Sequence, residues 1–178
     1  MTKQAKIGLI HIYCGEGKGK TTAAMGLITR ALGHAYRVLL VQFLKNGKSG
    51  ELASLRQLPG IQILAGQVTK FSIAMTDQEK AATRALHLDY FHTATCLVRQ
   101  NDIDLLVLDE ILGAIESGMM TEEELVSFLD NKPAGLEVVL TGRIASERLM
   151  SRADYISQIA CVRHPYQRGI LAREGIEY

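Results

Sequence analysis

The stretch YCGEGKGKTTAAMG, residues 13–26, holds the residues whose types and spacing most plainly suggest chemistry. Three glycines alternate with charged residues, and two threonines follow before small helix-forming residues begin. Glycines let main-chain N–H groups approach a ligand closely because no Cβ stands in the way. N–H groups at the start of a helix form a concave set of donors with partial positive charge. The stretch therefore predicts a loop that holds an anion, most simply a phosphate.

The loop nearly matches the P-loop pattern, in which a glycine and four further residues precede Gly-Lys-Ser/Thr. Gly19, Lys20 and Thr21 supply the second half, whereas Cys14 stands at the position of the leading glycine. Lys20 would neutralise phosphate oxygens, and the Thr21 hydroxyl could bind Mg²⁺. Two more cations could add charge to this site, namely Lys18 and Arg30. The alternative is a glycine-rich hairpin with solvated lysines.

The stretch DIDLLVLDE, residues 102–110, ends an apolar run in two carboxylates, Asp109 and Glu110. An open parallel sheet gathers its ligands at the carboxyl ends of the strands, so either side chain could bind Mg²⁺ directly or through water. Side chains alternate along a strand, and the two should therefore point in different directions. The alternative is that they cap the next helix. Gln42 and Lys45 are expected at the same edge of the sheet, where Gln42 could instead be a satisfied core amide.

The elements that must position these residues alternate along the chain. Apolar runs rich in Val, Ile and Leu predict buried strands at residues 7–13, 37–43, 61–65, 105–109 and 137–141, with a weaker one at 156–162. Helical patterns lie at 21–34, 77–100 and 122–130, and the last two begin with capping-box pairs. Together they predict an α/β fold: a single P-loop (RecA-like) domain over residues 1–178, with a mostly parallel central sheet and helices on both faces.

Composition narrows the classes of protein. The chain has 178 residues, of which 47% are hydrophobic and 22% charged, as is ordinary for a soluble globular domain. The net charge of +1 and the absence of a basic tract give no sign of a nucleic-acid partner. No apolar run is long enough to span a membrane, and none resembles a signal peptide. The three scattered cysteines favour reduced thiols, so we expect a cytoplasmic protein without a zinc site.

A P-loop alone does not name a reaction, because kinases, ATPases, GTPases and motors share it. No Asn/Thr-Lys-x-Asp pattern for reading guanine is present, which argues against a GTPase. No second domain or basic tract suggests a motor on nucleic acid. A metabolic enzyme that uses ATP remains.

Four segments together resemble the ATP:corrinoid adenosyltransferases of the P-loop type. They are GEGKGKTTAAMGLITRALGHAYRVLLVQFLKNG, LLVLDEI, EVVLTGR and VRHPYQRGILAREGIEY, and the resemblance runs from residue 8 to residue 178. The family's own loop also lacks the leading glycine, so Cys14 is a family trait. The resemblance implies transfer of the 5′-deoxyadenosyl group of ATP to the Co(I) of a reduced corrinoid, cobalamin or cobinamide, with triphosphate released. It also implies Mg²⁺, an electron-donating reductase and a homodimer.

Matching positions to the family assigns roles to single residues. The implied phosphate ligands are Gly15, Gly17, Gly19, Lys20, Thr21 and Thr22. Glu16 matches a residue that contacts the ribose, and Arg30 matches a basic residue near the nucleotide. Glu110 matches the metal-binding carboxylate, beside Asp109. In the family the nucleotide is held reversed, so the loop cradles the terminal phosphate and C5′ stays accessible.

Two further segments carry expected site residues. Arg143 follows the strand expected at 137–141 and could reach phosphate, or it could pair with Glu147 one helical turn later. The expected catalytic residues are Lys20, Glu110 and Arg143. The corrinoid pocket of relatives includes a Phe and a Trp that help displace the lower axial ligand of cobalt. Phe71 matches the first position, Ile73 stands at the second, and the chain has no Trp. Phe71 could instead belong to the hydrophobic core.

Two other functions stay open at this point. A small P-loop ATPase or kinase would transfer the γ-phosphate of ATP, as the loop alone allows. A nucleotide or corrinoid carrier without turnover would follow from the missing aromatic residue. The phosphorus-containing product distinguishes all three.

Overall fold

A computed structural model describes residues 7–66, 75–100 and 103–177 of the chain. They form a six-stranded sheet in the order β3-β2-β4-β5-β1-β6, and its neighbouring strands are parallel. The strands are β1 Ile10–Cys14, β2 Val38–Gln42, β3 Ile61–Leu64, β4 Leu105–Asp109, β5 Glu137–Thr141 and β6 Tyr155–Gln158. The helices are α1 Lys20–Gly33, α2 Gly50–Leu55, α3 Asp77–Arg99, α4 Ile111–Glu116, α5 Glu122–Asp130 and α6 Glu147–Met150, with a 3-10 helix at Pro165–Arg168. The predicted α/β fold with a parallel sheet is confirmed.

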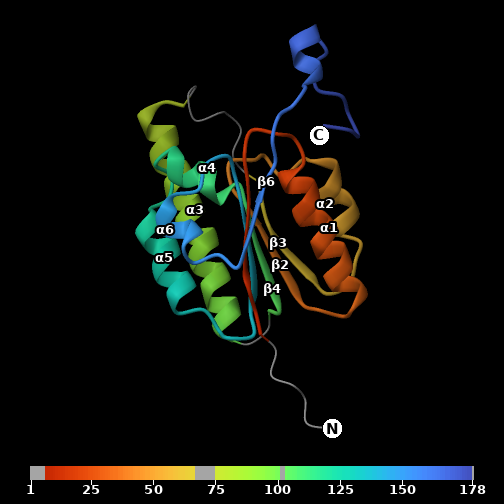
Figure 1. Cartoon of the computed structure of the whole chain (residues 1–178). Coiled ribbons are helices and arrows are strands. Elements are labelled where there is room, and N and C mark those ends of the chain that lie inside the picture. The colour runs from red at the N-terminus through yellow and green to blue at the C-terminus, as the bar shows by residue number, and fades with distance from the viewer. Residues whose placement is uncertain (1–6, 67–74, 101–102, 178) are drawn as a thin grey trace.

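Helices cover both faces of the sheet, as Figure 1 shows. On one face, α1 and α2 pack against the strands through residues such as Ile28 and Leu52. On the other face, α3, α4 and α5 pack through residues such as Phe91, Ile111 and Leu125. Strands β2 and β4 are buried along their whole length. Continuous apolar runs are therefore needed at the centre of the sheet, because neither side of these strands meets water.

The strand order brings polar residues together at one edge of the sheet. Strand β4 lies between β2 and β5, so Asp109 at its end lies beside Gln42 at the end of β2, its partner in the register. Thr141 ends β5, which pairs on its other side with β1, the strand that leads into the glycine loop. Four chain segments that are distant in sequence thus meet at the carboxyl ends of the strands.

The ends of several elements differ from the predicted ones. Strand β1 begins at Ile10 instead of residue 7, and β6 spans Tyr155–Gln158 instead of 156–162. The short helices α2, α4 and α6 had no counterpart among the predicted elements. Both predicted capping boxes are present: Thr76 and Glu79 open α3, and Thr121 and Glu124 open α5.

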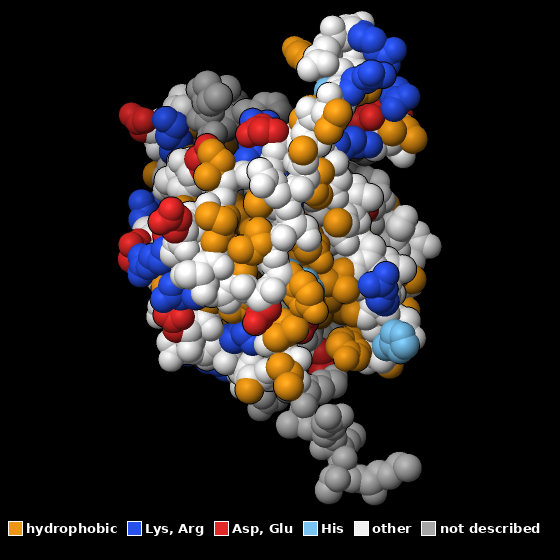
Figure 2. Space-filling model, in the orientation of Figure 1, with side chains coloured by type: hydrophobic (Ala, Val, Ile, Leu, Met, Phe, Trp, Pro, Cys, Tyr) orange, Lys and Arg blue, Asp and Glu red, His pale blue; other side chains and the backbone are white. Residues whose placement is uncertain are grey.

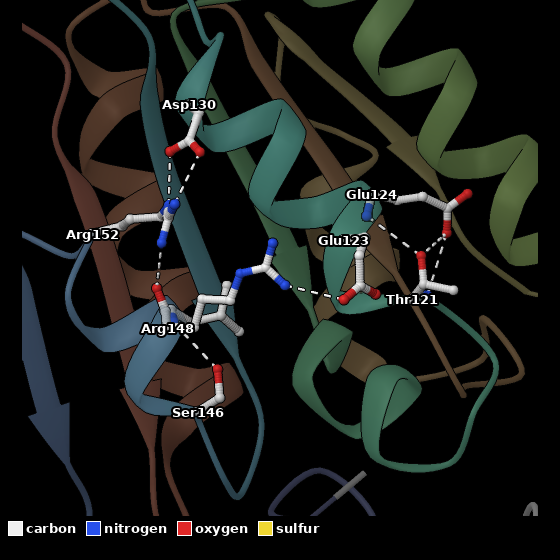
Figure 3. Close-up of polar contacts among 8 residues, drawn as sticks. Thr121, Glu123, Glu124, Asp130, Ser146, Arg148 and Arg152 are labelled. Atoms are coloured by element: carbon white, nitrogen blue, oxygen red, sulfur yellow. Dashed lines mark hydrogen bonds and ion pairs between the residues drawn. The ribbon is translucent and has the colours of Figure 1, made fainter.

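Helix α6 is tied to α5 by two ion pairs (Figure 3). The Arg148 guanidinium lies 3.0 Å from Glu123, and the Arg152 guanidinium contacts both oxygens of Asp130, at 2.7 and 3.0 Å. At the start of α6, the hydroxyl of Ser146 accepts the N–H of Leu149. The pairs are exposed, so each contributes little stability alone. They hold α6, which follows the loop that contains Arg143, against α5.

The chain after β5 exposes much of its apolar surface. Large hydrophobic side chains are exposed at Ile144, Tyr155, Ile156, Val162, Tyr166, Ile170, Leu171 and Ile176. Figure 2 shows hydrophobic side chains gathered over the β6 edge of the sheet, and Lys and Arg side chains on the projecting C-terminal segment. The three cysteines are free thiols. Within the described ranges, no helix is both long and apolar enough to cross a bilayer.

Candidate functional site

The glycine loop joins β1 to α1 and is shaped by close main-chain packing. Gly15 has φ +103° and donates its N–H to Arg143 O at 2.8 Å. Gly17 donates its N–H to Ile159 O at 2.8 Å. A Cβ at Gly17 would lie 2.6 Å from Ala160 O, so only glycine fits against this chain segment. These two glycines therefore seat the loop against neighbouring loops, and their expected contacts with phosphate stay predictions.

The N-terminus of α1 provides the donors that suit an anion. Gly19 has φ +124°, and Ala23 makes the first hydrogen bond of the helix, donating to Gly19 O at 2.8 Å. The N–H groups of residues 20–22 consequently have no acceptor within the helix itself. The Lys20 ammonium lies over the loop, donating to Gly15 O at 2.6 Å and Gly17 O at 2.8 Å. Main-chain donors and a cation thus occupy one surface.

Asp109 lies directly behind this surface and is fully buried, with 0% of its surface exposed. Its Oδ1 accepts hydrogen bonds from the hydroxyls of Thr21 at 2.9 Å and Thr141 at 2.8 Å. Its Oδ2 accepts from Gln42 Nε2 at 3.2 Å and from the Lys45 ammonium at 2.8 Å. Four donors thus surround one carboxylate, and they come from three segments of the chain: the start of α1, the end of β5, and the end of β2 with the loop after it.

Glu110 is the N-cap residue of α4 and has a left-handed main chain, with φ +62°. Its N–H donates to the Thr141 hydroxyl, but its own side chain makes no capping hydrogen bond. Glu110 is thus the N-cap residue by position, but the alternative that a carboxylate side chain caps this helix is wrong. Burial and the neighbouring Asp109 raise the pKa of Glu110, while Lys45, Lys20 and Arg143 partly oppose that shift. Glu110 lies at the surface of the pocket described next.

A pocket of about 610 Å³ opens over the loop. It is lined by Gly17, Lys18, Gly19, Lys20, Thr21, Thr22, Met25, Lys45, Gly50, Glu51, Ser54, Glu110, Gly175, Ile176 and Glu177. Most of the predicted phosphate and metal residues thus lie at one pocket, with Asp109 in contact with two of its lining residues. Among the described residues, no three His, Cys, Asp or Glu side chains are grouped to hold a metal by themselves.

Three predicted residues lie elsewhere. Arg143 and Glu16 form an ion pair at 3.6 Å beside the loop, with side chains 68% and 64% exposed. Arg143 thus pairs with Glu16 in place of the alternative partner Glu147. Arg30 lies in the last turn of α1, about 15 Å along the helix axis from Lys20. Phe71 falls outside the described residues, as does Ile73 at the position of the missing aromatic.

The C-terminal segment returns to the loop, which the sequence did not indicate. The Lys18 ammonium donates to Ile176 O at 3.0 Å and lies 3.6 Å from a carboxylate oxygen of Glu177. Arg173 donates to Glu177 from its N–H and from its guanidinium. The hydrogen bond from the Arg173 side chain is the main cause that lowers the pKa of Glu177 to about 2. A permanent negative charge therefore lies at the mouth of the pocket.

A buried histidine supports the segment that carries Lys45. His87 of α3 is fully buried and accepts the N–H of Leu44 at its Nε2, at 3.3 Å. The proton of the neutral ring must then be on Nδ1, which has no partner among the described residues. Burial lowers the pKa of His87 to about 4, so the ring is neutral at neutral pH. No motif in the sequence pointed to this contact.

Comparison with known proteins finds relatives over nearly the whole chain. Residues 6–178 match the model of the family described as ATP:corrinoid adenosyltransferase BtuR/CobO/CobP. The corrinoid adenosyltransferase of Pseudomonas aeruginosa is 31% identical over 96% of this chain and 84% of its own length. The corrinoid adenosyltransferases of Escherichia coli K12 and Salmonella typhimurium LT2 are each 30% identical over 98% of this chain and 88% of their own.

Solved structures show the same kind of fold. The cytoplasmic domain of the type VII secretion ATPase EccC from Thermomonospora curvata has a TM-score of 0.52 and 18% identity to this chain. The likeness covers 84% of this chain but only 20% of the EccC chain. At that identity the likeness concerns the fold alone.

Proposed function

Since this chain belongs to the ATP:corrinoid adenosyltransferase family and is an enzyme of that type, we propose that its glycine loop binds the triphosphate of ATP and leaves C5′ open to the corrinoid. The observation that carries this proposal is one pocket in which the N-terminus of α1, Lys20 and Thr21 lie together in front of buried Asp109. Such a surface suits a polyphosphate, because it offers N–H donors and a cation side by side.

The reaction sets clear requirements for the protein. Co(I) is already a strong nucleophile, so the protein need not supply a general base. It must place C5′ in line with cobalt and stabilise the charge that develops on the leaving triphosphate. Lys20, with the N–H groups of residues 20–22, is suited to the second task. Arg143 and Glu16, paired at the rim, are candidates for contacts with phosphate and ribose.

The site also fits a divalent cation. Thr21 offers a hydroxyl, and Asp109 and Glu110 offer carboxylates, which are the hard oxygen ligands that Mg²⁺ prefers. The Lys45 ammonium already contacts both Thr21 and Asp109, so the spot favours positive charge. We propose that Thr21 and Asp109 hold Mg²⁺ directly or through water, with Glu110 nearby. Bound there, the ion would neutralise phosphate charge.

Analysis of the products tests the function. The protein is mixed with Mg-ATP and chemically reduced cobalamin or cobinamide without oxygen. We expect an alkyl-cobalt absorption spectrum and triphosphate as the phosphorus-containing product. ADP and phosphate alone would identify an ATPase or kinase, and binding without turnover would identify a carrier.

Four further proposals concern Phe71, the oligomeric state, the electron donor and the location in the cell. Phe71, the match to a corrinoid-pocket residue, should contact the corrinoid, and Phe71→Ala should reduce turnover more with Co(II) and a reductant than with Co(I).

A homodimer would cover the apolar surface that gathers around β6, and sedimentation velocity measures whether the protein is a dimer. A reductase must supply the electron that forms Co(I); replacing the chemical reductant with a purified flavoprotein reductase tests this. The free thiols suit the reducing cytoplasm, which cell fractionation checks.

A further inference from the structure

The side chain of Lys45 lies where a metal ion would meet its protein ligands. Its ammonium is 2.8 Å from Asp109 Oδ2 and 3.2 Å from Thr21 Oγ1. The Asp109 carboxylate is fully buried, whereas the Lys45 side chain is 28% exposed and lines the pocket. A positive charge of the protein itself therefore already satisfies the buried carboxylate.

The main chain before Lys45 fixes this position. Phe43 N donates to Asp109 O at 2.9 Å, so the chain follows the end of β4 beyond β2. Leu44 then has a left-handed main chain, with φ +55°, and its N–H is held by His87. The turn directs the next residue back over the carboxylate. Contacts on both sides of Leu44 thus specify where the Lys45 side chain starts.

A metal ion bound at these oxygens competes with the Lys45 ammonium for them. Mg²⁺ binds oxygen ligands at about 2.0–2.1 Å, so an ion bound directly at Asp109 Oδ2 and Thr21 Oγ1 would take the oxygens that the ammonium now contacts. Positive charges a few Å apart repel, most strongly where burial reduces screening. Lys45 must therefore leave Asp109 before metal binds. Its four-carbon stem is flexible, and the pocket beside Lys20 is open to it.

We propose that Lys45 is an internal counter-cation that competes with Mg²⁺ for Asp109 and Thr21, and that it moves to the polyphosphate when the metal–nucleotide complex binds. The proposal rests on the metal ligands assigned under the proposed function. It has a direct consequence: free metal binds weakly to the protein without nucleotide, because it must displace Lys45 without offering a new anion. Phosphate provides that anion, so metal and polyphosphate enter together.

Titration of nucleotide-free protein with Mn²⁺, followed by electron paramagnetic resonance, tests the competition. Lys45→Gln and Lys45→Met should each lower the Kd for Mn²⁺ by at least about tenfold, because they remove the competing charge. Lys45→Arg keeps the charge and should stay within about twofold of the unaltered protein. Lys48→Gln makes the same charge change on an exposed residue of the same loop and should also have little effect. Circular dichroism verifies that each variant is folded.

Unchanged or weaker Mn²⁺ binding in both Lys45→Gln and Lys45→Met would overturn the competition. The competition would also be overturned if Lys45→Gln still tightened Mn²⁺ binding in a protein that carries Asp109→Asn, since the gain in affinity must come through that carboxylate. The proposed move of Lys45 to the polyphosphate is tested by calorimetry with inorganic tripolyphosphate, in the presence of EDTA to remove metal ions. Lys45→Gln should weaken binding severalfold while Lys48→Gln does not, and equal binding would overturn the transfer. Neither assay uses ATP turnover or a corrinoid, so both stand apart from the test of adenosyl transfer.

Discussion

Lys20 shows how the loop is prepared before any ligand arrives. Its ammonium is held over the loop by the carbonyls of Gly15 and Gly17, and a phosphate would accept the same N–H groups. Lys20→Ala should therefore lower kcat/KM for adenosyl transfer by at least ~10-fold, because a charge-assisted contact with the leaving group is lost. Lys48→Ala is the matched control for charge. Unchanged kinetics in Lys20→Ala would remove the loop from the proposed site.

His87 gives a prediction about pH. Its pKa falls from the ordinary 6.5 to about 4 in the native protein because the ring is buried. Between these values the unfolded chain binds a proton that the native ring does not, so stability is present above about pH 6.5 and is lost as pH falls. The free energy of unfolding should decrease by up to about 3 kcal/mol over this window. Protonation would also place a donor against the N–H of Leu44.

Comparison with a variant isolates this contribution. Glu110 works in the opposite direction, since its raised pKa gives the native protein the proton above the ordinary value of 4.5. Urea unfolding is therefore measured for the unaltered protein and for His87→Gln at several pH values. The contribution of Glu110 is the same in both proteins and drops out of the difference between them. The unaltered protein should lose stability more steeply on acidification. Parallel curves would contradict a neutral buried His87.

At the scale of elements, the junction of the glycine loop with the chain after β6 leaves no room for a side chain at Gly17. A Cβ at Gly17 would lie 2.6 Å from Ala160 O, which is main chain and cannot easily move. Gly17→Ala should therefore destabilise the protein by roughly 1–3 kcal/mol in urea unfolding. Gly26 of α1 is the control, because a Cβ added there would have nothing within 4 Å. Gly26→Ala should stabilise by about 0.5–1 kcal/mol, and equal stability of the two variants would contradict the close packing.

The length of an element decided whether the sequence could predict it. Helices α1, α3 and α5 show their apolar period over two turns or more, and the central strands are continuous apolar runs. Helices α2, α4 and α6 have six residues or fewer, too few to display a helical period. Strand β6 is exposed at all four positions, so no buried run marks its limits. Short or exposed elements form because the rest of the fold holds them.

The same distinction holds for the site. Lys20, Thr21 and Asp109 were predictable because a local motif and a strand end carry them. Gln42 and Lys45 could be placed at the right edge of the sheet, but their hydrogen bonds to Asp109 join residues 67 and 64 positions apart. The contact of Lys18 with the C-terminal segment spans 158 positions. Contacts of this kind depend on the register of the whole sheet, which no short pattern encodes.

At the scale of the whole molecule, the glycine loop and the C-terminal segment meet at one pocket. The loop after the first strand and the segment after the last strand both line it, so the C-terminal segment covers part of the proposed polyphosphate site. Figure 1 shows this segment projecting beyond the sheet and turning back above α1. Its few contacts with the loop are exposed, which makes them easy to exchange for a ligand.

Glu177 is the residue through which this cover should affect binding. Its carboxylate lies 3.6 Å from the Lys18 ammonium, and a pKa of about 2 keeps it charged in neutral solution. This carboxylate offsets the positive charges of Arg173 and Lys18 beside the pocket, so Glu177→Gln should lower the Kd for tripolyphosphate by about two- to fivefold at low salt. Glu174→Gln makes the same change on an exposed residue of the segment and should have little effect. Calorimetry at two salt concentrations checks both, since the gain should shrink as salt screens the charges; weaker binding in Glu177→Gln would mean that the segment helps to hold the anion.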